Sequence, residues 1–404
     1  MIENQVVRYF KGLAARHPLA LRVQLWGGAC ADLGPNPEVT LRLNNPRAAR
    51  HFLRPTLAGL GEGFVEGEID IEGPIRSVVS IAEAISRDVD QTSGKGALPA
   101  WIARHTRQTD RSAIEYHYDV SNEFYRLWLD PQMVYSCAYF RDGDEALAIA
   151  QTNKLEHVCR KLMLAPGERL LDIGCGWGAL AIHAARHHGA QVVGVTLSTN
   201  QYEMARERVR EEGLEAQVEI RLQDYRDVAG ENSFDKISSI GMFEHVGLKN
   251  LREYFDLIVR LLKPGGVTLN HGITSTDPDS RSVGLGAGEF IDRYVFPDGE
   301  LPHVSLAISH MSSAGLELTD AESLRRHYAR TLWLWSDAFE ARLARARELA
   351  GERRARIWRV YLAGCAHAFA HGWINIYQLQ AVKPRADRDG AFSPLPLSRD
   401  YIYR

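Results

Sequence analysis

Residues 169–178, RLLDIGCGWG, constrain the fold of this chain more than any other stretch. A short apolar run, predicted as a buried strand, leads into glycines at alternate positions: Gly174, Gly176 and Gly178. The segment AIHAARHH that follows is predicted as a helix. Glycines let the backbone pass close to a ligand because no Cβ stands in the way, and a helix N-terminus offers free N–H groups. The stretch therefore predicts a nucleoside-like ligand, and the plain alternative is a tight strand-to-helix turn.

The spacing of the glycines separates two classes of cofactor. A dinucleotide fold has G-x-G-x-x-G with an acidic residue about 20 residues further on. Here the spacing is G-x-G-x-G, and the next predicted strand, QVVGVTLSTN, carries no acid. The order D-x-G-x-G-x-G, from Asp172 to Gly178, is common in methyltransferases that bind S-adenosylmethionine. The motif therefore favours S-adenosylmethionine over a dinucleotide.

Length and composition bound the remaining possibilities. The 404 residues exceed what one core usually fills, so two units are expected. A formal charge of −3 does not support nucleic-acid binding, and no stretch approaches the ~20 apolar residues of a membrane span. The N-terminus lacks the pattern of a signal peptide. Five scattered cysteines without C-x-x-C spacing indicate reduced thiols in a cytoplasm, and no metal site.

Residues 1–90 read as a separate α+β module. Helices are expected in VVRYFKGLAARH, PRAARHFLRP and IRSVVSIAEAISR, and strands in LRVQLW, VTLRL and GFVEGEIDIEG. The module carries no cluster of catalytic residue types. It is expected to act either as a scaffold or as a cap that binds lipid or a partner.

Residues 91–100, QTSGKGALPA, read as a linker between domains. The basic residues Arg104, His105, Arg107 and Arg111 follow, either as solvated surface or as a site for an anionic membrane surface. An aromatic stretch at 113–140 is then predicted as core that also closes over the ligand as a lid. Aromatic walls suit a reaction that develops positive charge.

From residue 150 to 272, predicted strands alternate with predicted helices. The strands are LLDIG, QVVGVT, QVEIRLQ, FDKISSI and GVTLNHGI. This alternation predicts an α/β, doubly wound, mainly parallel sheet, and ligands bind such sheets at the carboxyl ends of the strands. Residues 275–300 read as a loop, later segments as helices, and residues 385–404 as a loosely held tail.

Nine segments, in order over about 110–384, carry a broad resemblance. They are YHYDVSNEFYRLWLD, YSCAYF, LLDIGCGWG, GVTLSTNQ, SIGMFEHVG, HGIT, RYVFPDGELP, HYARTLWLW and AGCAHAF. The chain resembles the cyclopropane fatty acid synthase and mycolic acid cyclopropane synthase family of S-adenosylmethionine-dependent methyltransferases. The resemblance implies a class I, Rossmann-like domain at 101–384, with a seven-stranded sheet and lid helices. Residues 1–90 resemble the extra domain of the bacterial enzymes.

The resemblance also implies a reaction. The family methylates the cis double bond of an unsaturated acyl chain on a membrane phospholipid, and proton loss from the resulting cation closes a cyclopropane ring. A bound bicarbonate ion is taken to be the base. The five positions that match its cage are Glu244, His271 and Tyr328 through side chains, and Cys137 and Ile273 through backbone N–H groups. A buried anion needs such converging donors, and an ionised Glu244 accepts the bicarbonate hydroxyl proton.

The cofactor contacts implied by the resemblance come from four segments. The positions are Tyr135, Ser136, Asp172, Gly174, Gly176, Gly178, Thr196, Gln201, Asp224, Tyr225 and Arg226. Cys365 matches a cysteine expected to line the acyl pocket and not to act as a nucleophile. Cys175 is expected to be a small loop residue, since a reactive thiolate needs a lowered pKa. Gly272, where relatives often have threonine, is expected to enlarge the pocket slightly.

Three alternatives stay open at this point. Some relatives with the same fold make methyl- or methylene-branched fatty acids, and the cage is compatible with the proton loss in that chemistry too. A small-molecule N-methyltransferase needs neither the cage nor an acyl tunnel, and a non-catalytic lipid carrier would rely on the amino-terminal module. We expect a cytoplasmic enzyme that visits the inner face of the membrane, and a homodimer is compatible with the sequence.

Overall fold

The computed structural model describes residues 2–16, 18–53, 55–90, 120–281, 283–297, 299–387, 390–392 and 394–403. The chain divides into two compact units. Unit 1 comprises residues 1–102, 283–297 and 336–368, and unit 2 comprises 103–282, 298–335 and 369–404. The predicted linker at 91–100, the four basic residues after it, and Tyr116 and Tyr118 lie outside the described residues.

Unit 2 is built on a seven-stranded sheet of order β10-β11-β9-β8-β5-β6-β7. Its strands are β5 (Arg169–Ile173), β6 (Gln191–Thr196), β7 (Val218–Leu222), β8 (Phe234–Ile240), β9 (Leu262–Ser275), β10 (Glu317–Ser323) and β11 (Ile374–Val382). Strands β5 to β9 pair in parallel, whereas β11 runs antiparallel to both β9 and β10. The predicted doubly wound, mainly parallel sheet is confirmed.

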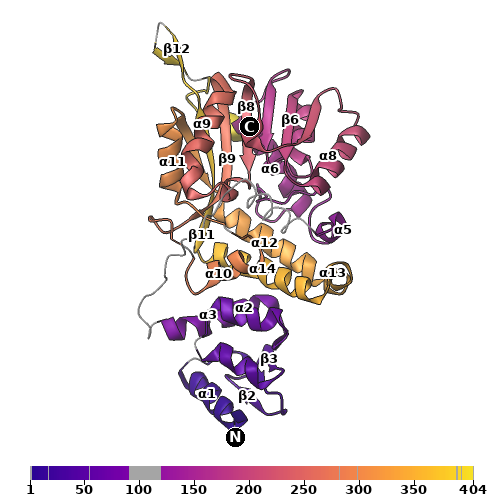
Figure 1. The fold of residues 1–404 in the computed structure, drawn as a ribbon, viewed down its shortest axis with the longest axis vertical. Helices are drawn as coiled ribbons and strands as arrows, with labels where there is room; N and C mark the ends of the chain where they lie inside the picture. Colours follow the sequence, from indigo (N-terminus) through magenta and orange to yellow (C-terminus); the bar gives the residue numbers. More distant parts are fainter. Residues whose placement is uncertain are drawn as a thin grey trace. The chain divides into compact units, whose positions relative to one another are not determined.

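Helices cover both faces of this sheet (Figure 1). They are α6 (Leu147–Lys161), α7 (Ala179–His188), α8 (Thr199–Glu211), α9 (Leu251–Leu261) and α11 (Val304–Ser313). Because successive strand side chains point to opposite faces, Leu170 packs in one core cluster with α6 and α7. Its neighbour Leu171 packs in a second cluster with α9 and α11. This two-sided burial explains why β5 and β6 read as largely apolar runs, whereas β7 at the edge of the sheet alternates.

The connections of unit 2 carry the remaining short elements. These are α5 (Asn122–Tyr125), η2 (Tyr225–Asp227), η3 (Phe243–His245), η4 (Leu248–Asn250), β12 (Arg385–Asp387), β13 (Gly390–Phe392) and α15 (Asp400–Tyr403). Helix α12 (Arg325–Glu340) begins in unit 2 and ends in unit 1, and α14 (Glu352–Ala370) begins in unit 1 and ends in unit 2. No helix in the described ranges is long and apolar enough to cross a membrane.

Unit 1 contains the expected amino-terminal α+β module. Its elements are α1 (Ile2–Arg16), β1 (Leu21–Gln24), β2 (Cys30–Asp32), β3 (Val39–Leu43), η1 (Pro46–Phe52), α2 (Leu57–Val65), β4 (Ile69–Glu72), α3 (Ile75–Asp90), α10 (Ala287–Tyr294) and α13 (Leu343–Ala350). The sheet order is β2-β1-β3-β4. Arg356 of α14 joins the unit through Asp70 of β4, with Nη2 2.7 Å from Oδ1. Unit 1 therefore includes segments from beyond residue 90, and the boundaries 1–90, 91–100 and 101–384 stay a prediction.

Two expectations for local structure in unit 1 are wrong. Residues 63–65 belong to helix α2, capped by the Thr56 side chain, and not to a strand. Gly63 allows the close packing of this helix, since a Cβ there would lie 2.7 Å from Ile69 Cδ1. The predicted loop at 275–300 contains helix α10, whose Arg293 pairs with Glu62 of α2 at 2.6 Å.

Residues 399–402 of the carboxyl-terminal tail are held more firmly than expected. Ile402 of α15 is buried, Arg399 pairs with Asp320 at 3.0 Å, and the Gln380 amide donates to Tyr401 Oη at 2.9 Å. The polar, proline-containing composition of the tail hides these few anchoring side chains.

Candidate functional site

The glycine loop between β5 and α7 adopts a backbone that glycine favours. Gly174, Gly176 and Gly178 have φ angles of 76°, 55° and 80°. These lie in the left-handed region, which disfavours residues with a Cβ. A Cβ at Gly178 would also lie 3.2 Å from the Cβ of Ala205 in α8, whereas a Cβ at Gly176 would meet open space. Gly178 thus allows helix packing, and Gly176 leaves room for a ligand.

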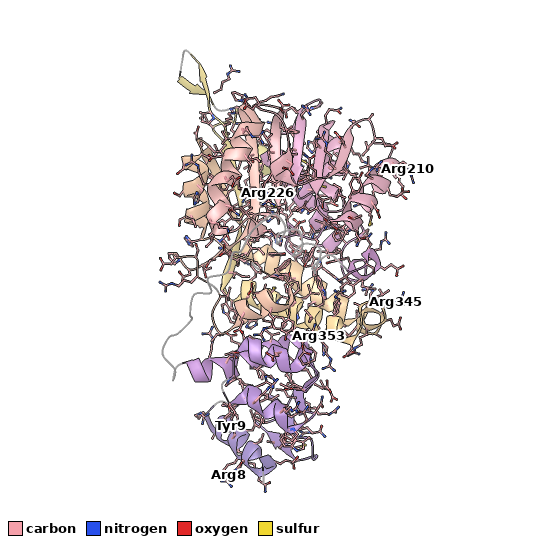
Figure 2. All side chains as sticks on the ribbon, viewed as in Figure 1. Arg8, Tyr9, Arg210, Arg226, Arg345 and Arg353 are labelled. Atoms are coloured by element: carbon pink, nitrogen blue, oxygen red, sulfur yellow. The ribbon has the colours of Figure 1, made fainter. Side chains whose placement is uncertain are left out.

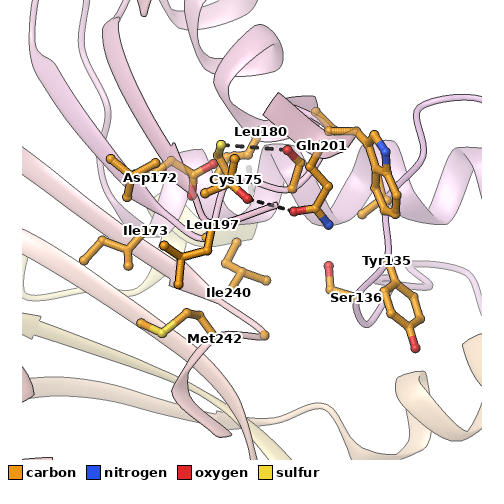
Figure 3. Close-up of a pocket in the computed structure, with 18 of the residues that line it drawn as sticks. Tyr135, Ser136, Asp172, Ile173, Cys175, Leu180, Leu197, Gln201, Ile240 and Met242 are labelled. Atoms are coloured by element: carbon orange, nitrogen blue, oxygen red, sulfur yellow. Dashed lines mark hydrogen bonds between the residues drawn. The ribbon is translucent and has the colours of Figure 1, made fainter. Parts of the chain in front are cut away.

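A cavity of about 140 Å³ lies at the carboxyl ends of β5, β6 and β8, where Figure 3 shows its lining. Tyr135 and Ser136 come from the segment after α5 and face Asp172 and Ile173 across the cavity. The predicted cofactor positions in the lining are Tyr135, Ser136, Asp172, Gly174, Gly176, Thr196, Gln201, Tyr225 and Arg226. Residues from four distant segments therefore meet in one pocket.

Gly178 and Asp224 do not line this cavity but support residues that do. Asp224 caps η2 by accepting from the Arg226 backbone N–H at 2.9 Å, and its carboxylate pairs with the Arg226 guanidinium at 2.7 Å. Arg226 is consequently held at 16% side-chain exposure, whereas Arg210 on α8 is 64% exposed (Figure 2). The pair fixes Arg226 at the pocket wall.

Asp172 is a buried carboxylate at the end of β5. Parallel pairing sets Asp172 opposite Ser238 of β8, whose hydroxyl donates to Asp172 Oδ1 at 2.9 Å. Burial raises the pKa of Asp172 to about 6, although the Ser238 hydrogen bond and the nearby Lys154 charge lower it. The site therefore contains a buried acidic group that forms no ion pair among the described residues.

The sequence interpretation missed several residues of the lining, among them Lys154, Trp177, Gln223 and His245. The signal for Lys154 lies in the spacing of α6, whose buried face includes Gln151, Lys154 and Lys161 among apolar residues. The Gln151 amide donates to the Ser136 carbonyl at 2.9 Å, and Lys154 Nζ donates to Ser136 Oγ at 3.0 Å. Helix α6 thus positions the lid segment at 134–136.

The described part of the aromatic stretch forms packed core beside the pocket. Tyr125 is fully buried and lies 5.1 Å from Trp177 and 5.7 Å from Tyr135, measured between ring centroids. Trp128 packs against Trp335 of α12 at 5.4 Å. Tyr135 therefore lines the pocket from a rigid aromatic base.

Glu244 lies in η3, just beyond the end of β8. The backbone N–H of Ile273 in β9 donates to Glu244 Oε1 at 2.7 Å, whereas Oε2 is buried without a hydrogen-bond partner among the described residues. The Ile273 N–H was expected to face bicarbonate, so its bond to Glu244 is a difference from that expectation. Burial raises the pKa of Glu244 to about 7.

His271 is fully buried in β9, two residues before Ile273. The Gln378 amide nitrogen of β11 lies 3.3 Å from His271 Nδ1, while Nε2 has no hydrogen-bond partner among the described residues. In this amide orientation Gln378 donates, so the proton of the neutral ring belongs on Nε2. Burial lowers the pKa of His271 well below its usual value, which keeps the ring neutral.

Backbone pairing connects the remaining two cage positions to the same end of the sheet. Ile273 pairs with Ile376 of β11, and the Ile376 carbonyl accepts from the Leu324 N–H at 2.9 Å. The Leu324 carbonyl in turn accepts from the Tyr328 N–H at 2.9 Å and lies 3.8 Å from Cys137 Sγ. The structure thus joins the Cys137 and Tyr328 segments to β9 through β11.

The two other cysteines of interest are protonated thiols. Burial raises the pKa of Cys365 in α14 to about 12, and it raises the pKa of Cys175 well above its usual value. Neither thiol has the lowered pKa that a nucleophile needs. Cys365 belongs to unit 1, and its place in an acyl pocket stays a prediction.

Gly272 does not enlarge the pocket, contrary to expectation. A Cβ at this position would lie 2.9 Å from Cδ1 of Phe243, a residue that is 1% exposed. The Phe243 ring fills the space that a larger side chain would occupy. Gly272 therefore permits close packing between η3 and β9.

Family models match both parts of the chain. Residues 105–379 match the model described as mycolic acid cyclopropane synthetase, and residues 9–90 match a domain of unknown function. The chain is 49% identical to a "probable fatty acid methyltransferase" of Pseudomonas putida, over 96% of this chain and 97% of that protein. It is 38% identical to the cyclopropane-fatty-acyl-phospholipid synthase of Escherichia coli K12, over 84% and 86% of the two chains.

Solved structures agree with the family match. The cyclopropane synthase MmaA2 from Mycobacterium tuberculosis superposes with a TM-score of 0.65 at 34% identity, covering 68% of this chain and 98% of that one. Mycolic acid cyclopropane synthase CmaA1, complexed with SAH and CTAB, gives 0.64 at 37% identity over 68% and 98%. The chain belongs to the mycolic acid cyclopropane synthetase family of S-adenosylmethionine-dependent methyltransferases.

Proposed function

We propose that the protein methylates the cis double bond of an unsaturated acyl chain on a membrane phospholipid and closes a cyclopropane ring. One observation carries this proposal: Glu244 Oε2 and His271 Nε2 are buried polar atoms without partners among the described residues. Leaving such atoms unpaired is costly, so a polar group of a ligand is expected between these segments.

The two atoms fit bicarbonate, the ion that the resemblance implies. His271 Nε2 donates, while Glu244 Oε2 accepts, and a bicarbonate ion has both acceptor oxygens and one O–H donor. Bound bicarbonate would supply the general base, and bound S-adenosylmethionine supplies the methyl group. Tyr328 and the backbone N–H of Cys137 are the proposed further donors.

Different residues of the chain would hold the bicarbonate and polarise it. The Ile273 N–H fixes one Glu244 oxygen at 2.7 Å and leaves the other free to accept a proton. The Gln378 amide contacts His271 Nδ1, so the ring proton is on Nε2, which can act as a donor. With a pKa of about 7, Glu244 is partly ionised near neutrality, which suits a proton acceptor.

We assign the pocket at the ends of β5, β6 and β8 to S-adenosylmethionine. Glycine at 176 leaves open space beside the loop, and Tyr135, Asp172, Thr196 and Arg226 supply polar groups around it. Thr196 Oγ1 donates to Gln201 Oε1 at 2.9 Å, which orders this wall. We place the enzyme in the cytoplasm and transiently at the inner face of the membrane, because the proposed phospholipid substrate is part of the membrane.

The test uses the purified chain, S-adenosylmethionine and liposomes with monounsaturated phospholipids. We expect acyl chains heavier by one CH₂ by mass spectrometry, with cyclopropane proton resonances in the NMR spectrum. Absence of any mass gain would contradict the proposal. Replacement of His271 with alanine is expected to reduce the rate strongly, and full activity in that variant would exclude the cage.

A branched product in place of a cyclopropane ring is supported by the name of one relative. The Pseudomonas putida protein, 49% identical, is named a probable fatty acid methyltransferase, which specifies no ring. In a methyl- or methylene-branched product the same mass spectrometry would find added carbon. Exocyclic methylene (=CH₂) or methyl-branch resonances in place of cyclopropane resonances would identify this chemistry, since unreacted chains give only internal olefinic resonances.

A further inference from the structure

Lys154 is a buried cation in the wall of the proposed cofactor pocket. The side chain projects from α6, is 2% exposed, and lines the cavity. Its Nζ donates to Ser136 Oγ at 3.0 Å, which is its single hydrogen bond among the described residues. No carboxylate in that part of the chain lies within ion-pair distance of Nζ.

The carboxylates that influence the pKa of Lys154 accept hydrogen bonds from other groups. Asp130 accepts from the backbone N–H groups of Gln132 and Val134 at 2.9 and 2.8 Å. Asp172 accepts from Ser238. Burial lowers the pKa of Lys154 to about 8, although Asp130, Asp172, Cys137 and Cys159 oppose this shift. The ammonium is therefore mostly charged at neutral pH and poorly paired.

Burying an ammonium with only one neutral acceptor is costly, and an anionic partner would stabilise it. An ammonium has three donors, and only one of the Lys154 donors is used within the described residues. A carboxylate entering the cavity would supply the missing acceptor through a charge-assisted hydrogen bond.

The opposite wall carries the complementary charge. Asp172 lines the same cavity, is 3% exposed, and lies across from Ser136 (Figure 3). The pocket thus has a cation on one wall and a carboxylate on the other, without an ion pair between them. Such a pair of separated charges matches a zwitterionic amino-acid group.

We propose that Lys154, together with the Ser136 hydroxyl, binds the α-carboxylate in the methionine part of S-adenosylmethionine, while Asp172 faces its α-ammonium. This inference rests on the proposed placement of the cofactor in this cavity. Because Lys154 also binds Ser136, it links cofactor binding to the position of the lid segment. The sulfonium and its methyl group then lie between two anchored ends.

The test compares two ligands that differ in one group. S-adenosylmethionine and decarboxylated S-adenosylmethionine share the sulfonium, adenosine and amine, and calorimetric titration without lipid measures their affinities. For the unaltered protein we expect decarboxylation to weaken binding about 10- to 100-fold, as expected for a charge-assisted hydrogen bond. Equal affinities would overturn the carboxylate site without any variant.

The variants Lys154→Met and Lys154→Gln identify the residue responsible. Both are expected to bind S-adenosylmethionine about as weakly as its decarboxylated form, while affinity for the decarboxylated form changes less than about threefold. Retained binding of that form also reports that the variants fold. A full preference for the carboxylate in either variant would overturn the role of Lys154.

Lys236→Met is the matched control. Lys236 of β8 is also buried, pairs with Glu168 at 3.5 Å, and is not among the residues lining the cavity. This variant is expected to keep the full preference for the carboxylate, and its loss would overturn the assignment to Lys154. If the unaltered protein binds neither ligand, the proposed pocket itself fails, which is distinct from failure of the lysine assignment.

Discussion

Replacement of Glu244 with glutamine is expected to increase stability and to reduce activity. Burial raises the pKa of Glu244 from 4.5 to about 7. Such a rise corresponds to about 3 kcal/mol of free energy between the ionised and neutral forms. A neutral glutamine of the same shape removes that cost, and it also removes the proton acceptor.

The sign of the pH dependence follows from the direction of the shift. The folded state binds the Glu244 proton more tightly than the unfolded state does. The associated stability is full below pH 4.5 and is lost as the pH rises through about 7. Between pH 5 and pH 8 the variant should therefore gain about 2–3 kcal/mol relative to the unaltered protein.

Urea unfolding at several pH values measures this difference. Glu253→Gln, on the exposed side of α9, removes the same charge from the surface and is the control. A difference between Glu244→Gln and the unaltered protein that stays constant with pH would refute the reasoning.

Activity should change in the opposite direction. With bicarbonate held at a fixed concentration, the rate of the unaltered enzyme is expected to rise about tenfold between pH 6 and pH 8, as Glu244 ionises. The glutamine variant should be about 100-fold slower. A variant that kept both the rate and the pH profile would exclude Glu244 as the proton acceptor.

Three further predictions concern other parts of the chain. Gly178→Ala adds a crowded Cβ to a left-handed backbone and should cost about 2–3 kcal/mol by urea unfolding, compared with about 1 kcal/mol for the uncrowded Gly213→Ala. Lys161→Met removes the buried cation that pairs with buried Asp320 and partly exposed Glu322; because Arg399 and His157 still pair with these carboxylates, the loss should be about 2–3 kcal/mol, and a loss below 1 kcal/mol would contradict this account. Cys365→Ala should keep at least about half of the activity, because burial holds this thiol protonated, and abolished turnover would indicate a chemical role.

Much of the fold follows from local patterns. Strands β5 and β6 were recognisable as largely apolar runs, because both faces of a parallel sheet are buried, and β7 was recognisable by its alternation of apolar and polar residues. Strands β10 and β11 lack an apolar run, since β10 is mostly polar at the edge of the sheet and β11 mixes apolar residues with Asn375, Gln378 and Gln380. The helical state of residues 63–65 was missed because glycine disfavours helices unless tertiary packing requires it.

The candidate site was likewise predicted only in part from the sequence. The motifs named Glu244, His271 and nine of the residues that line the pocket, because these positions lie in recognisable segments, most of them at strand ends or in the glycine loop. Lys154 belongs to no motif, and its sequence signal is only its spacing on the apolar face of helix α6, so its burial beside Ser136 was needed to identify it.

The sequence by itself indicated the family through its nine matching segments, the cofactor class through the spacing of the glycines, and the parallel part of the sheet through the alternation of strands and helices. Only the tertiary structure decided which polar groups are paired. In the structure the Ile273 N–H donates to Glu244. Glu244 Oε2 and His271 Nε2 have no partners among the described residues, and in the same part of the chain Lys154 is buried without a paired carboxylate. The physical reason is that hydrogen bonding and desolvation depend on neighbours from distant segments, which no local pattern specifies.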